Sequence, residues 1–467
     1  MENKKIASNK VLWIFAVGQL GWSLLAAIIT NWLLFFYQPS AEEIEKGQQA
    51  FLPKGTFLGI TVIGAVYAFG RIFDAVTDPY IAGKSDSFRH RLGRRIPFMR
   101  FAAIPFGLAT VLIFLSPFKA GSVGNAVLLF ISAMMFYFFM TCYCTPYNAL
   151  IPELGRTQEA RINLSTFISV TFFVGNGIAY LVPNIAAFFS DSKGYAGSFR
   201  ITVAILAVLA VVCMLIPAFL IDENTYADTE PSKSTAFRSL VSTFKNREFR
   251  NFVLSDILYW IGITLFNSGL PFYITVLLGL DTTMSFPLFA AMTFISLLCY
   301  PLVNIMSKKL GKKKLICFAF IFFSAAFVVT ALAGIFKINS LAYGILIAVL
   351  AAVPMAILGI LPQAVVADIS EADKLETGES RQGMFYAART FAFKFGQAFA
   401  AVVFSSVSLI NEDVEKGHSG YGLGYRLTAV IAAVLCLLGG IVFLRYNEKR
   451  IIGTIGSDDK ENNDAKA

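Results

Sequence analysis

Hydrophobic residues run along this 467-residue chain in long stretches, and polar residues gather in short segments between them. A stretch of about 20 mostly apolar residues is long enough for an α-helix to cross the ~30 Å hydrocarbon core of a bilayer. A transmembrane β-barrel would show short alternating segments instead. Since every backbone N–H and C=O needs an internal partner in lipid, the pattern predicts an all-α membrane protein. The twelve predicted spans lie near residues 11–37, 55–83, 96–118, 122–150, 162–189, 201–221, 251–279, 284–307, 315–335, 341–369, 383–410 and 425–446.

Composition supports this interpretation and orients the chain. Hydrophobic residues make up 56% and charged residues 15%, against about 25% charged in soluble domains. The net charge of +9 does not indicate nucleic acid, because the basic residues lie in short loops beside apolar spans. With the termini in the cytoplasm, 28 Lys and Arg residues lie on the cytoplasmic side and 8 on the other. Since cytoplasmic loops carry the excess of Lys and Arg, both termini are predicted inside the plasma (inner) membrane of a bacterium.

Cysteine and histidine give no sign of a disulfide scaffold or an enzyme site. All six cysteines fall inside apolar stretches, and no CxxC pair occurs. The two histidines, His90 and His418, lie on opposite sides of the membrane in the predicted topology, so they cannot form a two-histidine metal site. The basic N-terminus precedes an apolar stretch of about 27 residues, too long for a signal peptide, and is expected to lead into an uncleaved first span. No cofactor is expected beyond a coupling ion.

The chain divides into two halves that resemble each other. A polar connection at 222–250 separates residues 1–221 from residues 251–446, and a disordered cytoplasmic tail is expected at 447–467. After the second span of each half comes a loop that combines glycine with clustered positive charge. Pro79 is expected to end the second span. Two parallel six-helix repeats resemble the major facilitator architecture, in which substrate binds between the halves.

A few ionisable residues fall within the predicted spans, where each charge costs at least ~2.5–3.5 kcal/mol and therefore marks a functional candidate. They are Arg71, Asp74, Asp78, Asp256, Asp368, Arg389 and Lys394.

Arg71, Asp74 and Asp78 are spaced i, i+3, i+7, which puts them within about 60° of one helix face. If all three are ionised, one negative charge is left uncompensated. Such a face can take up H⁺ on a carboxylate or Na⁺ through carboxylate oxygens, and the sequence leaves this choice open. The alternative is a structural Arg–Asp pair that locks the helix, for which one Asp would suffice.

Two motifs resemble one transporter family. Residues 70–79, GRIFDAVTDP, resemble the span-two signature of the glycoside–pentoside–hexuronide:cation symporters, the melibiose-permease-like family. Residues 367–394 resemble the segment of that family around spans ten and eleven. The resemblance extends from the first span to the twelfth. It implies that Asp74 and Asp78 bind the cation and that Thr77 and Thr141 supply further oxygens. It also implies that Lys394 couples the two halves.

Where the melibiose transporter uses two aspartates, an aromatic residue and an arginine to hold its sugar, this chain departs from the family. The matching positions here are Ser23, Cys144, Asn148 and, approximately, Ser169. A melibiose-like galactoside is therefore not expected, while a pentoside, a uronide or another glycan fragment remains open.

Other polar and aromatic residues are candidates for lining a substrate cavity. Gln19, Trp22 and Ser23 share one face of the first span. Ordinary helix packing is the alternative for each aromatic residue. The remaining candidates are Tyr143, Tyr147, Asn148, Asn176, Trp260, Asn267 and Gln397.

Arg94 and Arg95 belong to the basic loop expected to close a cytoplasmic gate, with simple topogenic charge as the alternative. Asp368 is expected either to form a gating ion pair with a basic loop or to cap its helix. Asp256 is expected to act in function, or else only to cap or snorkel. Arg389 has two open roles, attracting an acidic sugar or neutralising Asp74 and Asp78 when no cation is bound.

The sequence therefore predicts a secondary symporter for a sugar or sugar derivative, driven by Na⁺ or H⁺, working as a monomer. The same fold carrying a lipid-like amphiphile is the alternative. A channel or membrane enzyme is less favoured, and the chain lacks a GxxxxGK[ST] phosphate-binding loop for ATP-driven transport.

Overall fold

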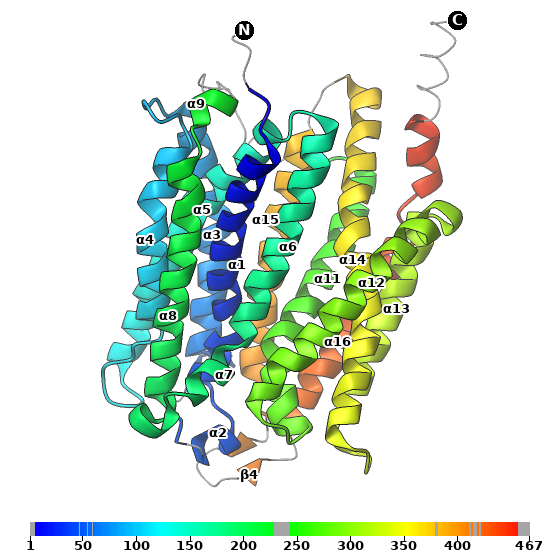
Figure 1. Ribbon diagram of the computed structural model, residues 1–467. Coiled ribbons are helices and arrows are strands. Elements are labelled where there is room, and N and C mark those ends of the chain that lie inside the picture. Colours follow the sequence, from blue (N-terminus) through cyan, green and yellow to red (C-terminus); the bar gives the residue numbers. More distant parts are fainter. Residues whose placement is uncertain are drawn as a thin grey trace, which may run out of the picture.

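The computed structural model describes residues 5–45, 47–53, 55–57, 59–227, 243–378, 382–410, 412–413, 418–419 and 422–455. Long helices run roughly side by side through the molecule (Figure 1). Those of the first half are α1 (Asn9–Tyr37), α3 (Val62–Ser87), α4 (Ile96–Ile113), α5 (Val123–Leu154), α6 (Gln158–Tyr180) and α8 (Ser190–Leu220). Those of the second half are α11 (Arg247–Phe272), α12 (Ser285–Leu310), α13 (Lys312–Ala331), α14 (Ser340–Thr377), α15 (Gln382–Val407) and α16 (Leu423–Phe443).

Short elements connect these helices. They are the helices α2 (Ala41–Glu45), α7 (Val182–Ala187) and α9 (Glu223–Tyr226), the π-helical turn η1 (Tyr273–Leu277) and the 3₁₀ turn η2 (Thr282–Met284). Within the described ranges, strands occur only as two antiparallel pairs, β1 (Thr56–Phe57) with β2 (Ile60–Thr61) and β3 (Glu412–Asp413) with β4 (His418–Ser419).

The twelve long helices correspond one to one with the predicted spans. Eleven of the described helices are long and apolar enough to cross a membrane. The twelfth is α3, whose 26 residues include Arg71, Asp74 and Asp78. Large apolar side chains such as Phe101, Val208, Leu298 and Ile321 point outward. An apolar exterior of this kind fits a helix bundle solvated by lipid.

Several predicted boundaries are corrected. Pro79 lies inside α3, which continues to Ser87, because spanning helices tolerate an interior proline when neighbouring groups satisfy the freed carbonyl. The second span begins at Val62 rather than at 55, because the Thr61 side chain caps the helix by accepting from Gly64 N at 3.1 Å. Residues 448–455 are helical, in contrast to the disordered tail expected from 447. Residues 228–242 of the central connection and 456–467 of the tail lie outside the described residues.

Each half packs mainly within itself, and a few helix pairs cross between the halves. In the first half α1 packs on α6 and α8, and in the second α16 packs on α11 and α13. The close packing of α1 on α8 requires glycine at position 21, where a Cβ atom would lie 2.4 Å from Ala210 O. The halves meet chiefly where α3 packs on α15 and α1 on α11. The charged face of α3 therefore lies at the junction of the two halves.

Candidate functional site

The acidic residues of α3 meet a lysine from the other half. Asp74 is fully buried and Asp78 half-buried. Lys394, on α15, places its Nζ atom 2.8 Å from Asp74 Oδ2 and 2.6 Å from Asp78 Oδ2. One ammonium thus bridges two carboxylates across the junction of the halves. The structure brings these three predicted residues together, although 316 positions separate Lys394 from Asp78 in the sequence.

Hydroxyl groups surround the carboxylates. Thr141, on α5, donates to Asp74 Oδ1 at 2.7 Å, and Thr77 lies 3.3 Å from the Thr141 hydroxyl. Thr77 also donates to the backbone carbonyl of Asp74 at 3.2 Å. Thr145, one turn after Thr141, donates to Asp78 Oδ1 at 3.3 Å. Sequence reasoning missed Thr145, although its spacing of four from Thr141 places both hydroxyls on one face of α5. The resulting set of oxygens suits either a proton or Na⁺.

Arg71 is held beside the carboxylates by aromatic rings. Its guanidinium lies 3.9 Å from Asp74 Oδ2, donates to the Tyr67 hydroxyl at 3.4 Å, and sits over the Tyr67 and Tyr137 rings at 5.5 and 5.3 Å. The Tyr137 ring comes this close because residue 70 is glycine, where a Cβ atom would lie 2.2 Å from the ring. With Arg71 and Lys394 both charged, the two aspartates are balanced. The negative charge that α3 alone leaves uncompensated is thus neutralised by Lys394 of α15.

Two tyrosines predicted as cavity-lining candidates join helices of the first half in this structure. The Tyr143 hydroxyl donates to Met214 O and the Tyr147 hydroxyl to Phe15 O, both at 2.8 Å. Tyr147 also stacks on the Phe15 ring at 4.1 Å. Ser23 donates to Leu20 O at 3.1 Å. The hydroxyls of the two tyrosines are thus used between packed helices of the first half, whereas that of Ser23 bonds to a carbonyl of its own helix.

The other cavity-lining candidates differ in whether their polar atoms have hydrogen-bond partners. Trp22 Nε1, Trp260 Nε1 and Gln397 Oε1 are buried and have no hydrogen-bond partner among the described residues. Gln19 is buried and Asn148 exposed. The remaining two candidates are Asn176, which donates to Phe172 O at 2.9 Å, and Asn267, which is half-buried.

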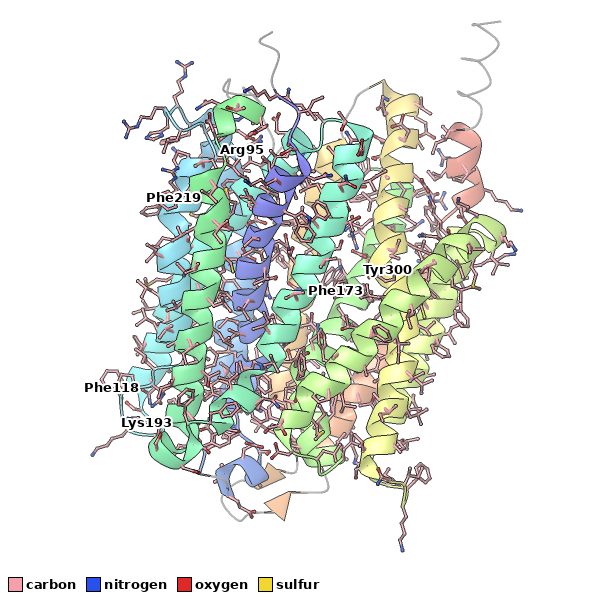
Figure 2. The ribbon with its side chains drawn as sticks, in the orientation of Figure 1. Arg95, Phe118, Phe173, Lys193, Phe219 and Tyr300 are labelled. Atoms are coloured by element: carbon pink, nitrogen blue, oxygen red, sulfur yellow. The ribbon has the colours of Figure 1, made fainter. Side chains whose placement is uncertain are left out.

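A cavity of about 660 Å³ lies between α6 and α12, within the range usual for small-molecule sites. Figure 2 labels Phe173 and Tyr300, which line it from the two halves. The lining combines hydroxyl groups and one guanidinium with apolar side chains. These residues are Arg161, Ile162, Ser165, Thr166, Ser169, Val170, Phe173, Val174, Leu297 and Tyr300. Sequence reasoning missed this surface, except that Ser169 matches a position where the family carries an arginine.

The two halves are joined by side-chain contacts at the end of the bundle where α1 and α15 end. Gln38, which follows α1, donates to Ser405 O and to the Ser408 hydroxyl on the α15 side, both at 2.9 Å. The Tyr180 ring stacks on Phe289 at 4.3 Å, so that α6 also meets α12 there. Contacts therefore close the interface at the end of the bundle far from the chain termini (Figure 1), while the cavity is lined by residues 161–174 of α6, from the start of that helix to its middle.

Arg389 pairs with Asp256 rather than with the carboxylates of α3. Its Nε atom donates to Asp256 Oδ2 at 2.7 Å and its Nη2 atom to Oδ1 at 2.8 Å. Both side chains are buried. The neutralising role considered for Arg389 at Asp74 and Asp78 belongs, in this structure, to Lys394. Asp256 neither caps nor snorkels, because its two oxygens face a guanidinium inside the second half.

The basic loop before α4 forms a charged cluster. Arg94 lies 3.6 Å from Glu153, and Arg95 lies 3.6 Å from Asp86 and 3.7 Å from Glu153. Burial lowers the pKa of Arg95, and Arg94 lowers it further, while the neighbouring carboxylates act in the opposite direction. Figure 2 shows Arg95 at the end of the bundle where α1 begins. All these groups belong to the first half.

Glu223, just after α8, fixes the same loop. Its carboxylate accepts from the backbone N–H groups of Arg94, Arg95 and Ile96 at 3.1, 2.8 and 2.9 Å. Ile96 is the first residue of α4 and Arg95 its N-cap, so two of these N–H groups lack partners within the helix, and Arg94 directly precedes them. Gly93 adopts a φ of +99° at this turn.

The second half repeats this arrangement. Glu448, just after α16, accepts from Lys312 N at 2.6 Å and from Lys313 N at 3.1 Å. Lys312 also pairs with Asp368 on α14, which is the ion pair with a basic loop that was one of the two expectations for Asp368. Sequence reasoning missed both glutamates, although each follows the last helix of its half.

Comparisons with known proteins agree with this architecture. Residues 14–450 match a family described as MFS/sugar transport protein. The uncharacterized symporter YnaJ of Bacillus subtilis (strain 168) is 26% identical, covering 83% of this chain and 80% of its own. The isoprimeverose transporter of Lactiplantibacillus pentosus is 22% identical, covering 66% of this chain and 62% of its own. The crystal structure of the nucleoside transporter NupG matches 94% of this chain and 99% of its own with a TM-score of 0.64. At 14% identity this last match shows a shared fold.

Proposed function

The chain belongs to the MFS/sugar transport protein family, and we propose that it is a symporter that moves a sugar or sugar derivative together with H⁺ or Na⁺. Family membership makes it a multi-pass membrane transporter with the major facilitator fold and not an enzyme. The observation that carries the coupling proposal is the position of Lys394. Its ammonium, from the second half, contacts the carboxylates of Asp74 and Asp78 in the first half at 2.8 and 2.6 Å.

Cation binding at Asp74 and Asp78 competes with Lys394 in this proposal. A proton on one aspartate, or Na⁺ among the aspartate and threonine oxygens, neutralises part of the charge that attracts the ammonium. Because Lys394 comes from the other half, weakening its ion pairs alters the contact between the halves. The cation thereby changes the balance between the two arrangements of the halves, which is what coupled alternating access requires.

The substrate binds at the cavity between α6 and α12 and the adjoining interface. Sugars need hydrogen-bonding groups around the ring together with an apolar surface against one ring face. Ser165, Thr166, Ser169 and Tyr300 supply hydroxyls, and the Phe173 ring supplies an aromatic surface. The family's description and the isoprimeverose transporter among the relatives support a sugar as the cargo.

We place the protein in the plasma membrane of a bacterium with both termini in the cytoplasm, because Lys and Arg concentrate at that end. The cavity between α6 and α12 then opens toward the cytoplasm. Arg94, Arg95 and Asp368 stiffen the cytoplasmic end of each half during gating.

An amphiphilic cargo is the second candidate, because half of the cavity lining is apolar and α6 and α12 are exposed along much of their length. A detergent-like or lipid-like molecule would place its tail against Ile162, Val170 and Leu297.

Uptake into proteoliposomes tests the proposal. The purified chain is given a panel of radiolabelled monosaccharides, glycosides and uronates with an imposed Na⁺ or H⁺ gradient. We expect one compound class to accumulate above its external concentration, and an ionophore that dissipates the effective gradient to abolish that accumulation. Uptake that never exceeds equilibration with either gradient would contradict symport. Thermal stabilisation by a lysophospholipid and by no sugar would instead support the amphiphile.

A further inference from the structure

Two side-chain contacts, one helical turn apart on both helices, join α11 to α15. The first is the bidentate pair in which Arg389 donates to both oxygens of Asp256 at 2.7 and 2.8 Å. In the second, the Trp260 ring stacks on Phe393 with centroids 4.3 Å apart and planes inclined by 20°. Residues four apart lie on the same helix face, so the two contacts form one continuous seam.

Lys394 follows Phe393 directly, and its ammonium leaves the second half to reach Asp74 and Asp78. Beside the seam, Gly396 lets the backbones of α15 and α11 approach, since a Cβ atom there would lie 3.1 Å from Ile257 O. The seam therefore lies immediately beside the residue that bridges the halves. Because Lys394 is attached to α15, the rotation and depth of α15 against α11 determine where its ammonium lies relative to the carboxylates of α3.

Stability alone does not explain why the seam contains an ion pair. The exposed fractions of the Arg389 and Asp256 side chains are 6% and 3%. Burying two charges is costly, and a well-packed apolar pair of similar volume is often as stable or more stable. What a bidentate guanidinium–carboxylate pair adds is a fixed orientation, because its two parallel hydrogen bonds define both position and angle.

We propose that Asp256 and Arg389 are positioning residues that hold α15 in the rotation and depth at which Lys394 engages Asp74 and Asp78. They thereby set how strongly Lys394 competes with the coupling cation. This inference rests on the proposed function, because the competition requires a cation site at the two carboxylates. Neither residue touches the cation in this scheme. Their influence passes through Lys394.

Cation binding to the detergent-purified full chain tests the inference without any transport step. Thermal stabilisation is titrated with NaCl, balanced by choline chloride, and in parallel by lowering the pH. The Asp256→Asn/Arg389→Gln double variant removes the ion pair without leaving one charge unpaired. Because a loosened Lys394 competes less, we expect the half-saturating cation concentration to fall by about three- to tenfold. Arg389→Lys keeps the charge without the bidentate geometry and should give an intermediate shift.

A double-mutant cycle separates positioning from general destabilisation. Lys394→Gln removes the competitor and should itself lower the half-saturating concentration. If Asp256 and Arg389 act through Lys394, adding their double substitution to Lys394→Gln produces no further fall, so the effects are non-additive. Arg100→Gln is the matched control, since Arg100 makes a helix–helix hydrogen bond to Ala218 O at 2.8 Å in the other half. This control should leave cation binding unchanged.

The outcomes distinguish the inference from the proposed function. A cation response in the unaltered chain that is the same in the Asp256→Asn/Arg389→Gln variant overturns the inference alone. A shift that adds fully to that of Lys394→Gln also overturns the inference alone. If neither Na⁺ nor H⁺ stabilises the unaltered chain, the cation site itself is refuted, and the inference falls with the proposed function.

Discussion

Lys394 Nζ lies 2.6 Å from Asp78 Oδ2, and this ion pair joins the second half of the chain to the first. Lys394 is buried, and Asp78 is the more accessible of the two aspartates that it contacts. Asp78 is therefore the carboxylate that is more open to an incoming cation. Asp78 is the residue at which the competition between Lys394 and a mobile cation is most directly tested.

Replacing Asp78 by Asn should abolish uphill accumulation while leaving exchange. The amide removes the negative charge that binds the cation, but its similar shape preserves helix packing. We expect the steady-state accumulation ratio in proteoliposomes to fall to about one. Since a driving force of ~1.4 kcal/mol corresponds to a tenfold accumulation, the loss should be roughly tenfold or more. Counterflow of preloaded substrate should persist. Asp191→Asn, an exposed aspartate in the same half, is the control and should transport normally. Full gradient-driven uptake by Asp78→Asn would refute the assignment.

Thr141→Val should shift cation activation, in a direction that depends on whether Na⁺ or H⁺ is the coupling ion. The Thr141 hydroxyl donates to Asp74 Oδ1 at 2.7 Å and lies 3.3 Å from Thr77, so valine removes an oxygen from the centre of the site at almost constant volume. A hydrogen bond to a charged group contributes about 1.5–3 kcal/mol. We therefore expect the half-saturating Na⁺ concentration for uptake to rise by about tenfold or more. If H⁺ is the coupling ion, the lost donor favours the protonated form of Asp74, and the half-saturating H⁺ concentration should fall instead.

Thr141→Ser keeps the hydroxyl and serves as the matched variant. It should restore cation activation to within about twofold of the unaltered chain, since the hydrogen bond to Asp74 is retained. Equal activation curves for the valine and serine variants would show that the hydroxyl has no part in cation binding.

A disulfide across the far end of the interface should trap the cavity-open arrangement. A Cβ atom at Gly64, on α3, would lie 3.2 Å from Ser405 Cβ on α15. This separation is close to the ~3.5–4.5 Å found in disulfides. In the Gly64→Cys/Ser405→Cys variant, a mild oxidant should abolish transport and a reductant should restore it. Each single-cysteine variant lacks the partner thiol and should be insensitive to the oxidant, as should the unaltered chain with its six free cysteines. Undiminished transport by the cross-linked protein would show that the halves need not separate here.

The sequence was sufficient to predict the spans and the charged face of α3, because both depend on local patterns. Long apolar stretches must become helices in lipid, and the spacing of Arg71, Asp74 and Asp78 places them on one face whatever the surroundings. The contact of Lys394 with that face joins positions that are 316 residues apart. The helical repeat cannot predict a contact between residues so far apart in the sequence. The role of Lys394 was predicted from the family resemblance alone.

Tyr143 and Tyr147 show why the cavity lining was harder to predict. A tyrosine in a spanning helix satisfies its hydroxyl equally well on a substrate or on a backbone carbonyl. Here the carbonyls of Met214 and Phe15 take this role. The choice depends on how α5 rotates against α1 and α8, and that rotation is set by tertiary packing rather than by local sequence.

The repeated glutamates lead to a prediction about stability. Glu223 accepts from three N–H groups at the start of α4, and Glu448 accepts from two at the start of α13. A carboxylate at a helix N-terminus is favoured by the helix dipole. Each hydrogen bond to a charged group contributes about 1.5–3 kcal/mol. Replacing either glutamate by alanine leaves several N–H groups without a side-chain acceptor, and should lower the melting temperature of the detergent-solubilised protein by roughly 3–5 °C.

Glu223→Gln and Glu448→Gln distinguish charge from hydrogen bonding. Glutamine keeps one acceptor oxygen but not the charge, so each should show about half of the loss seen with alanine. Because the two sites lie in different halves and share no partner, the losses in the Glu223→Ala/Glu448→Ala double variant should add. Differential scanning fluorimetry of the purified variants measures this directly. A melting temperature unchanged by Glu223→Ala would mean that the loop before α4 is held chiefly by the ion pairs of Arg94 and Arg95 with Glu153 on α5, and Glu153→Gln should then produce the loss.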